Sequence, residues 1–239
     1  MAELTYTSYI QTDALLSLQQ TQSPETMDRA AVLSEHFFIV AHQSCELWLK
    51  QVIADLSLAK ELLSAPFDQP AALETGTELL VRARELMRVL HEQVVALERL
   101  PLRHFAEFRP YLGTASGAQS MQFRVLGRLI GDGERDGELY GAFTRCAAAY
   151  GYDVAAICRL GVDGGALYRV AEALLDVGIG YWRWKVTHLG LVSKMIGSQG
   201  GTGGTSGEDF LARRVTVPFP ELRRLRGALH DQELARTSA

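Results

Sequence analysis

Two histidines lie on apolar faces of segments with helical periodicity, where an imidazole can act shielded from water. Phe38, Cys45 and Leu49 share a helix face with His42. His188 is surrounded in the same way by large side chains at helical spacing: Tyr181, Trp184, Leu191, Val192 and Met195. A histidine in such a place is either a core residue that makes one hydrogen bond, an axial haem ligand, or a polar group above a cofactor. The spacing leaves these alternatives open.

An arginine stands among aromatic residues in the stretch FAEFRPYL. Arg109 follows Phe105 and Phe108 within one helical turn of sequence. Such an arginine either extends its charge to solvent along an apolar surface or is a buried bidentate clamp for a carboxylate. The stretch therefore contains a candidate anion site that composition alone does not establish.

Residues 199–207 read QGGTGGTSG, a loop dense in glycine. It lacks the lysine of a phosphate-binding GxxxxGK[ST] loop, and no strand precedes it as in a dinucleotide-binding turn. A linker would separate two domains, but the chain beyond it is too short for a second one. Glycine lets backbone approach a ligand closely, and the hydroxyls of Thr202, Thr205 and Ser206 suit an ammonium or a carboxylate. We therefore expect a loop that lies over a binding site.

The elements that must position these residues are helices. Apolar residues recur at steps of three and four, and hairpin signals are weak, so we expect an all-α bundle of long helices with one core. Ser34 is the candidate N-cap of the first long helix, and Pro66 and Pro101 end the first two. The predicted helical segments are 34–64, 71–100, 119–130, one or two within 137–160, 163–198, 208–214 and a final amphipathic piece after Pro220. The first thirty residues lack a core pattern and are expected to form an arm.

Bulk composition excludes several classes of protein. The 239 residues carry a net charge of −4, with 47% hydrophobic and 22% charged residues, as in an ordinary globular chain. Nucleic acid is not an expected partner, because phosphate neutralisation needs clustered lysine and arginine. No apolar run approaches the ~20 residues of a membrane span, and the N-terminus has no signal-peptide pattern. With three widely spaced cysteines, these features predict a cytoplasmic protein that does not bind membranes.

Four separated stretches carry a recognisable pattern: LTYTSYIQTDALLSLQ, FFIVAHQSCELWLKQ, FRPYLGTASGAQSMQFR and THLGLVSKMIGSQGGTGGTSG. In their residues and their order they resemble the tryptophan 2,3-dioxygenase family of histidine-ligated haem enzymes. The resemblance implies a helical bundle around haem b, with residues 1–30 as an arm that contributes to a neighbouring subunit and residues 31–239 as the haem-binding oxygenase domain. It also implies a homo-oligomer, a tetramer or a dimer.

The resemblance implies roles for individual residues. His188 matches the proximal ligand of the haem iron, and His42 matches the distal histidine that faces the indole N–H. Phe38 matches an aromatic residue that packs on the indole, while Arg109 and Thr202 match the residues that bind the substrate carboxylate and ammonium.

Further positions match the family less directly or depart from it. Gly117 falls where backbone lies close to haem and oxygen, and Tyr6 and Tyr9 match the arm that reaches a neighbouring subunit's site. Phe105, in the substrate-binding wall, stands where tyrosine is common, and Ala118 replaces a phenylalanine. Gly200 stands where a basic residue is common, and the segment between Arg124 and His188 is shorter than in typical members. These departures affect pocket shape.

The implied activity is haem-dependent insertion of oxygen from dioxygen into the indole ring of L-tryptophan or a close derivative, giving an N-formylkynurenine-type product. The alternatives are a monooxygenase that makes an oxindole or hydroxylated product, a haem sensor without turnover, and a helical interaction protein without cofactor. Dioxygenation is the favoured expectation, because the matches to the haem ligand, distal histidine, carboxylate clamp and loop are all intact.

Overall fold

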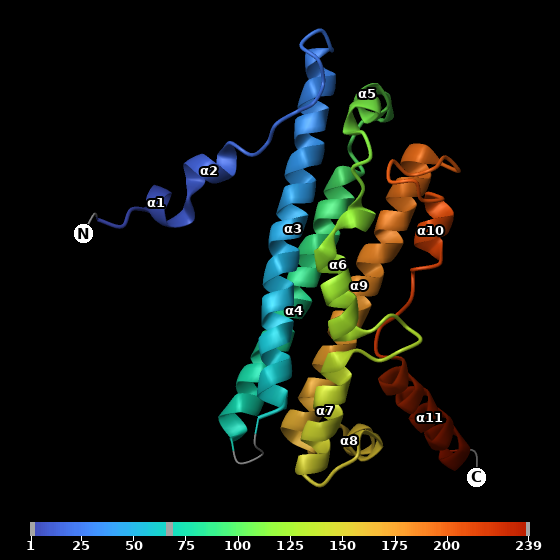
Figure 1. Ribbon diagram of the computed structural model, residues 1–239. Coiled ribbons are helices and arrows are strands. Elements are labelled where there is room, and N and C mark those ends of the chain that lie inside the picture. Colours follow the sequence, from blue (N-terminus) through green and yellow to red (C-terminus); the bar gives the residue numbers. More distant parts are fainter. Residues whose placement is uncertain (1–2, 66–68, 238–239) are drawn as a thin grey trace.

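The computed structural model describes residues 3–65 and 69–237, and these residues form helices joined by short connections (Figure 1). The α-helices are α1 (Tyr6–Ile10), α2 (Thr12–Leu16), α3 (Arg29–Leu63), α4 (Pro70–Leu97), α5 (Leu102–Phe108), α6 (Met121–Ile130), α7 (Glu138–Ala149), α8 (Val154–Leu160), α9 (Gly165–Ile196), α10 (Glu208–Ala212) and α11 (Pro220–Thr237). Three 3-10 helices are η1 (Arg109–Leu112), η2 (Gly117–Gln119) and η3 (Gly161–Gly164). Within the described ranges, β pairing is limited to one isolated bridge between Gly131 and Asp136, so the predicted all-α class is confirmed.

The three long helices α3, α4 and α9 form the body of the molecule. Helix α4 packs against both α3 and α9, and the shorter helices α5, α6 and α7 pack along α3. A Cβ at Gly180 of α9 would lie 2.9 Å from Cβ of Met87 on α4, so the absence of a side chain there allows the two helices to approach closely. Among the described residues, no helix is long and apolar enough to cross a membrane.

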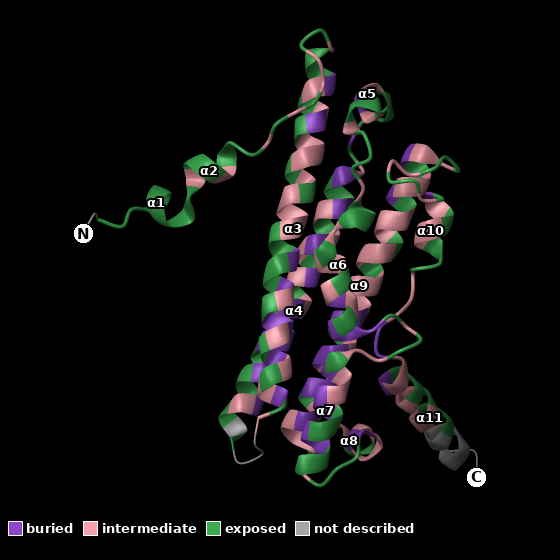
Figure 2. Ribbon diagram, viewed as in Figure 1, coloured by how far each residue is buried: buried purple, intermediate pink, exposed green. Residues whose placement is uncertain are grey.

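The buried side chains fall into two clusters, so the expectation of a single core was wrong. The larger cluster fills the body of the bundle, where Leu56, Leu80 and Phe143 are fully buried. The smaller one lies where α4, α5 and α9 meet and contains Val94, Leu97, Leu100, Phe108, Leu191 and Met195. Trp184 packs against both, because a large indole can span the boundary between them. Figure 2 shows buried positions along the facing sides of the long helices.

The first long helix begins earlier than the sequence predicted. Asp28, not Ser34, is its N-cap, and the Asp28 carboxylate accepts hydrogen bonds from the backbone N–H groups of Ala30 and Ala31 at 3.0 and 3.3 Å. Ser34 lies inside α3, and its Oγ is 2.8 Å from Nδ1 of His104, which ties α3 to α5. The predicted stop at Pro66 lies outside the described residues. The other predicted helices agree with the structure within a few residues.

The N-terminal arm leaves the bundle near the start of α3 (Figure 1). Glu35 is fully buried, and its carboxylate accepts the backbone N–H groups of Gln22 and Ser23 at 2.7 and 3.0 Å. This contact fixes the base of the arm. Beyond it, Tyr6 and Tyr9 of α1 are 76% and 70% exposed, so the tip of the arm is not buried by its own chain.

Candidate cofactor and substrate site

The two candidate histidines lie near each other from opposite helices, His42 on α3 and His188 on α9. Burial, together with the nearby His42 imidazole, lowers the pKa of His188 to about 4. Burial by surrounding groups also lowers the pKa of His42, although part of the residue is exposed to solvent. The Phe38 carbonyl and Glu46 act in the opposite direction and offset part of this shift. Both imidazoles are therefore neutral at pH 7, the form that binds a metal or accepts a hydrogen bond.

The protonation of His42 follows from its hydrogen bond. Its Nδ1 lies 2.7 Å from the backbone oxygen of Phe38, which can only accept, so Nδ1 carries the proton. The neutral ring therefore presents Nε2 as an acceptor. His188 makes no hydrogen bond to any of the described residues. Its ring is stacked on Trp184, with centroids 5.2 Å apart and planes at 6°.

The surroundings of His188 fit a haem ligand. A neutral imidazole without a protein partner is free to coordinate iron. Trp184 is stacked on Tyr181 and packs on Phe123, with centroid distances of 6.0 and 5.0 Å, so aromatic rings flank the histidine. Nε1 of Trp184 is buried without a hydrogen-bond partner, a polar atom that a bound group can satisfy. The donor set and the apolar walls thus suit a histidine-ligated haem.

An aromatic cluster joins His42 to the arginine segment. The ring of Phe38 lies 4.0 Å from that of His42, 6.0 Å from Phe105 and 5.6 Å from Phe108, centroid to centroid. Phe105 and Phe108 meet edge to face at 5.4 Å. These rings come from α3 and from α5, a helix that the sequence did not predict because its seven residues are too few to show a period. Together they form one apolar wall that leads toward Arg109.

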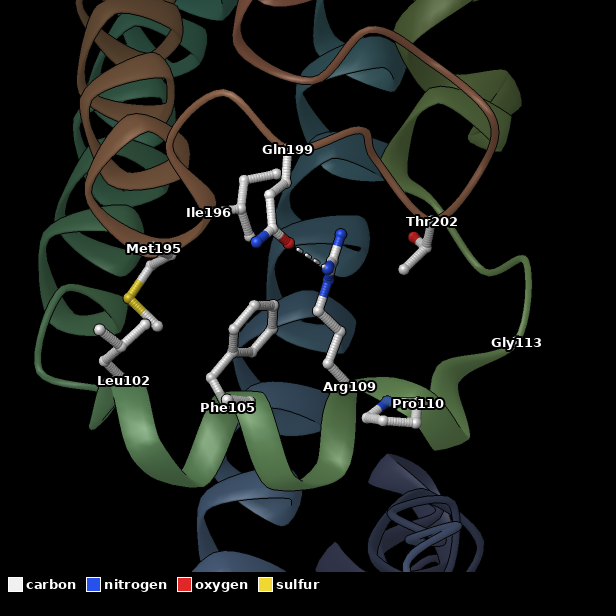
Figure 3. Close-up of a pocket in the computed structure, with 10 residues that line it drawn as sticks. Leu102, Phe105, Arg109, Pro110, Gly113, Met195, Ile196, Gln199 and Thr202 are labelled. Carbon is white, nitrogen blue, oxygen red and sulfur yellow. Dashed lines mark hydrogen bonds between the residues drawn. The ribbon is translucent and has the colours of Figure 1, made fainter.

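Arg109 lies in the wall of a pocket of about 680 Å³ (Figure 3). The pocket is lined by Leu102, Phe105, Ala106, Arg109, Pro110, Gly113, Met195, Ile196, Gln199 and Thr202. Nη1 of Arg109 donates to Oε1 of Gln199 at 3.2 Å, and Nη2 donates to the backbone oxygen of Gly200 at 2.7 Å. A volume of this order holds a small organic ligand, and the guanidinium gives it a fixed positive charge.

The glycine-rich loop is folded against the segment that follows α5. Its backbone is closed by hydrogen bonds from Gly201 to Thr205 and from Gly204 to Gly201, at 3.0 and 3.1 Å. Thr202 Oγ1 donates to the backbone oxygen of Ala115. A Cβ at Gly203 would lie 2.6 Å from Cβ of Ser116, so a side chain there would push the loop away. The loop therefore forms part of the pocket, as expected, rather than a spacer.

The structure brings most of the candidate site residues to one end of the bundle. Thr202 lines the pocket together with Arg109 and Phe105. Gly117 begins η2 in an exposed position, where an added Cβ would meet no atom within 4 Å. Tyr6 and Tyr9 are not brought to the site within the single chain, because the arm points away from the bundle (Figure 1).

Sequence reasoning missed several residues of the pocket. Gln199, Ile196 and Leu102 were given no role, although all three line it. Met195 was recognised only as an apolar neighbour of His188. Their position follows from α5 and the end of α9 meeting in space, and no local spacing signals that meeting.

The fold and the site define a class: helical-bundle proteins that hold two uncharged imidazoles among aromatic rings, beside a cationic pocket of small-molecule size. A family model described as tryptophan 2,3-dioxygenase matches residues 1–142 and 160–229. The chain belongs to the tryptophan 2,3-dioxygenase family, which confirms the resemblance drawn from the four motifs. Membership makes it an oxidoreductase of the dioxygenase class.

The chain aligns with individual relatives over nearly their whole length. The chain is 32% identical to the tryptophan 2,3-dioxygenase of Kineococcus radiotolerans over 270 residues, which cover 94% of this chain and 91% of the relative. It is also 32% identical to that of Anaeromyxobacter sp., with 95% and 97% covered. The family model leaves out residues 230–239 and, between its two matched ranges, residues 143–159, which run from within α7 through all but the last residue of α8.

Proposed function

We propose that the protein is a haem-dependent enzyme that inserts both atoms of dioxygen across the C2–C3 bond of the indole ring of L-tryptophan or a close derivative. The product is of the N-formylkynurenine type. The observation that carries this proposal is the pocket lined by Arg109, Thr202 and Phe105. The ring of Phe105 contacts that of Phe38, which in turn contacts His42. Arginine and hydroxyl groups suit the zwitterionic end of an amino acid, and the phenylalanines suit its ring.

His188 is the proposed ligand of haem b, because it is neutral and has no hydrogen bond to the described residues. A haem held there would supply an iron centre able to activate dioxygen. His42 presents Nε2 as an acceptor for the indole N–H, since its Nδ1 proton is held by the Phe38 carbonyl. In this role His42 orients the substrate and does not need to remove the weakly acidic proton of the indole N–H.

The remaining residues hold the amino acid in place. Arg109 binds the carboxylate, and Thr202 turns its hydroxyl from the Ala115 carbonyl to the ammonium. Phe38 and Phe105 pack on the indole, and the unhindered backbone at Gly117 leaves room beside the reacting bond. Fixing both ends of the substrate raises the rate by proximity, because the reacting atoms are already aligned.

We also propose a homo-oligomer in which Tyr6 and Tyr9 complete the site of a neighbouring copy. The exposure of both rings and of Leu4 and Leu16, each 70% or more, supports this, because exposed apolar side chains on one short segment are typical of contact surfaces. A cytoplasmic location is proposed as well, supported by the free thiols of the three cysteines.

The experiment that tests the function uses the haem-reconstituted protein, tryptophan and ¹⁸O₂, with and without reductant. Two labelled atoms in a ring-opened product support dioxygenation. One labelled atom in an oxindole, formed only with added reductant, contradicts it and indicates the monooxygenase. Haem binding without turnover of tryptophan or its methylated derivatives indicates a sensor, and no haem absorbance after reconstitution indicates an interaction protein.

A further inference from the structure

Gln199 lies opposite Arg109 in the wall of the pocket and is its partner across the site (Figure 3). The two residues are 90 positions apart in sequence, one at the start of η1 and the other just after α9. Nη1 of Arg109 donates to the side-chain oxygen of Gln199 at 3.2 Å, while Nη2 donates to the Gly200 backbone at 2.7 Å. The arginine therefore holds the loop by one side-chain and one main-chain contact.

The hydrogen bond from Arg109 fixes which end of the Gln199 amide faces the guanidinium. A guanidinium has donors only, so the amide must turn its oxygen to Arg109 and its NH₂ group away. Figure 3 shows this nitrogen on the side of Ile196, above the ring of Phe105. None of the described residues accepts a hydrogen bond from it. Two N–H donors of Gln199 are thus available beside the guanidinium.

The combined donor surface suits an anionic oxygen. A guanidinium carries five N–H donors, and two contacts leave others free for a carboxylate. The Gln199 NH₂ group extends this set of donors without adding charge, while its oxygen already accepts a hydrogen bond from Arg109. Gly200 has no side chain to fill the space between them.

We propose that Gln199 is a specificity-determining residue that donates a hydrogen bond from Nε2 to the substrate carboxylate, next to Arg109. This inference rests on the proposed function, because it takes an amino acid as the ligand. In this arrangement Arg109 and Gln199 together select a substrate with a carboxylate, whereas the family resemblance assigned carboxylate binding to Arg109 alone.

The test compares two substitutions of Gln199 in the haem-reconstituted full chain. Gln199→Met keeps the length and removes the hydrogen bonds, whereas Gln199→Glu keeps the shape and replaces the donors by a second carboxylate. Ser198→Ala, an exposed neighbour with no described contact, is the matched control. Titration calorimetry gives the dissociation constants of tryptophan, 3-indolepropionate, which lacks the ammonium, and tryptamine, which lacks the carboxylate.

We expect Gln199→Met to weaken tryptophan and 3-indolepropionate about 10-fold, since a hydrogen bond to a charged group is worth roughly that factor or more. Tryptamine should change by less than about 2-fold in the same variant. Gln199→Glu should weaken both carboxylates by about 100-fold, because the new carboxylate pairs with Arg109 and repels them, and it should tighten tryptamine.

The outcomes separate the inference from the function on which it rests. If Gln199→Met changes the dissociation constants of all three ligands equally, or changes none of them, the inference is overturned. The proposed function still stands in that case, provided that the wild-type protein binds tryptophan. Wild-type protein that does not bind tryptophan contradicts the proposed function and the inference together. Ser198→Ala should bind all three ligands as wild type does, and a loss in that variant would assign the effect to the loop as a whole.

Discussion

His42 and His188 are chemically alike, yet their surroundings give them different capacities. His42 is held by the Phe38 carbonyl at 2.7 Å and keeps one nitrogen as an acceptor. His188 has no described hydrogen-bond partner, and its pKa of about 4 keeps it unprotonated well below neutral pH. A ring that stays neutral and unengaged is the better metal ligand of the two.

Replacing His188 by alanine should therefore abolish stable haem binding, because it removes the neutral imidazole that no described residue engages by a hydrogen bond. The measurement is the haem absorbance of the reconstituted protein after gel filtration. Full retention of haem with an unchanged spectrum would contradict the assignment.

The matched control is His42→Ala, which removes the facing imidazole from the same site. We expect it to retain haem and to reduce turnover, since the indole N–H loses its acceptor. Equal loss of haem in both variants would show that the two rings act together in binding it.

Arg109→Leu should raise KM for tryptophan and lower kcat/KM. The fall in kcat/KM should correspond to a loss of about 2–5 kcal/mol of transition-state stabilisation, the usual cost of leaving a charged partner unpaired. Turnover of indole analogues without a carboxylate should change little. Because Arg109 also holds Gln199 and Gly200, thermal unfolding of the variant is measured alongside. Unaltered affinity for tryptophan would refute the clamp.

At this scale the sequence predicted much of what the structure assembles. Helical spacing singled out His42 and its apolar face, and the aromatic residues around Arg109 marked that segment, but only the family resemblance implied that Phe38, Phe105 and Arg109 share one site with His42. Gln199 carried no such signal, since its chemistry arises only from contact with a residue far away in sequence.

Among the elements, α9 links the site to the segment that follows the glycine-rich loop. Lys185 on α9 donates to the backbone oxygens of Arg214 and Thr216 at 2.8 and 2.7 Å. Its Nζ also lies 4.7 Å from the ring centroid of Tyr181. Burial lowers the pKa of Lys185 to about 8. The helix and the segment beyond α10 are thus joined by a partly buried ammonium.

This depressed pKa makes stability depend on pH in a defined window. Between about 8 and 10.5 the unfolded chain binds more protons at this lysine than the folded one, so its contribution to stability rises with pH there and is lost as pH falls toward 8. Lys185→Met removes that dependence. We expect the difference in unfolding free energy, wild type minus variant, to grow by roughly 1–2 kcal/mol from pH 8 to 10.5. This range is smaller than the full pKa shift implies, because solvent screens a partly exposed charge. Urea unfolding at several pH values measures it, and a difference that stays flat or falls contradicts the prediction.

The sequence placed some elements better than others. Helices α4 and α9 were placed within a few residues, because many turns of periodic sequence define them. The start of α3 was wrong by five residues, since Ser34 and Asp28 are both good N-caps and tertiary contacts decide between them. Helix α5 was missed, although it positions Phe105 and leads into Arg109.

In the whole molecule, the arm is a short segment on which several large apolar side chains, including Leu4, Tyr6, Tyr9 and Leu16, stay exposed in the single chain. Deleting residues 1–20 should lower the oligomeric state and raise KM for tryptophan, since the arm is proposed to complete a neighbour's site. Light scattering coupled to gel filtration measures the first effect, and steady-state kinetics the second. Tyr6→Ala with Tyr9→Ala tests the aromatic rings without shortening the chain. A fully active, monodisperse monomer after the deletion would rule the arrangement out.

The order in which the chain supplies its site residues has a consequence for biosynthesis. Phe38 and His42 emerge early from the ribosome, Arg109 near the middle, and His188 and Gln199 only when most of the chain has been made. A nascent chain that has not yet released α9 has neither the proposed iron ligand nor the loop that closes the pocket. On the proposed assignment of His188, haem capture would be a late event that selects complete chains over truncated ones.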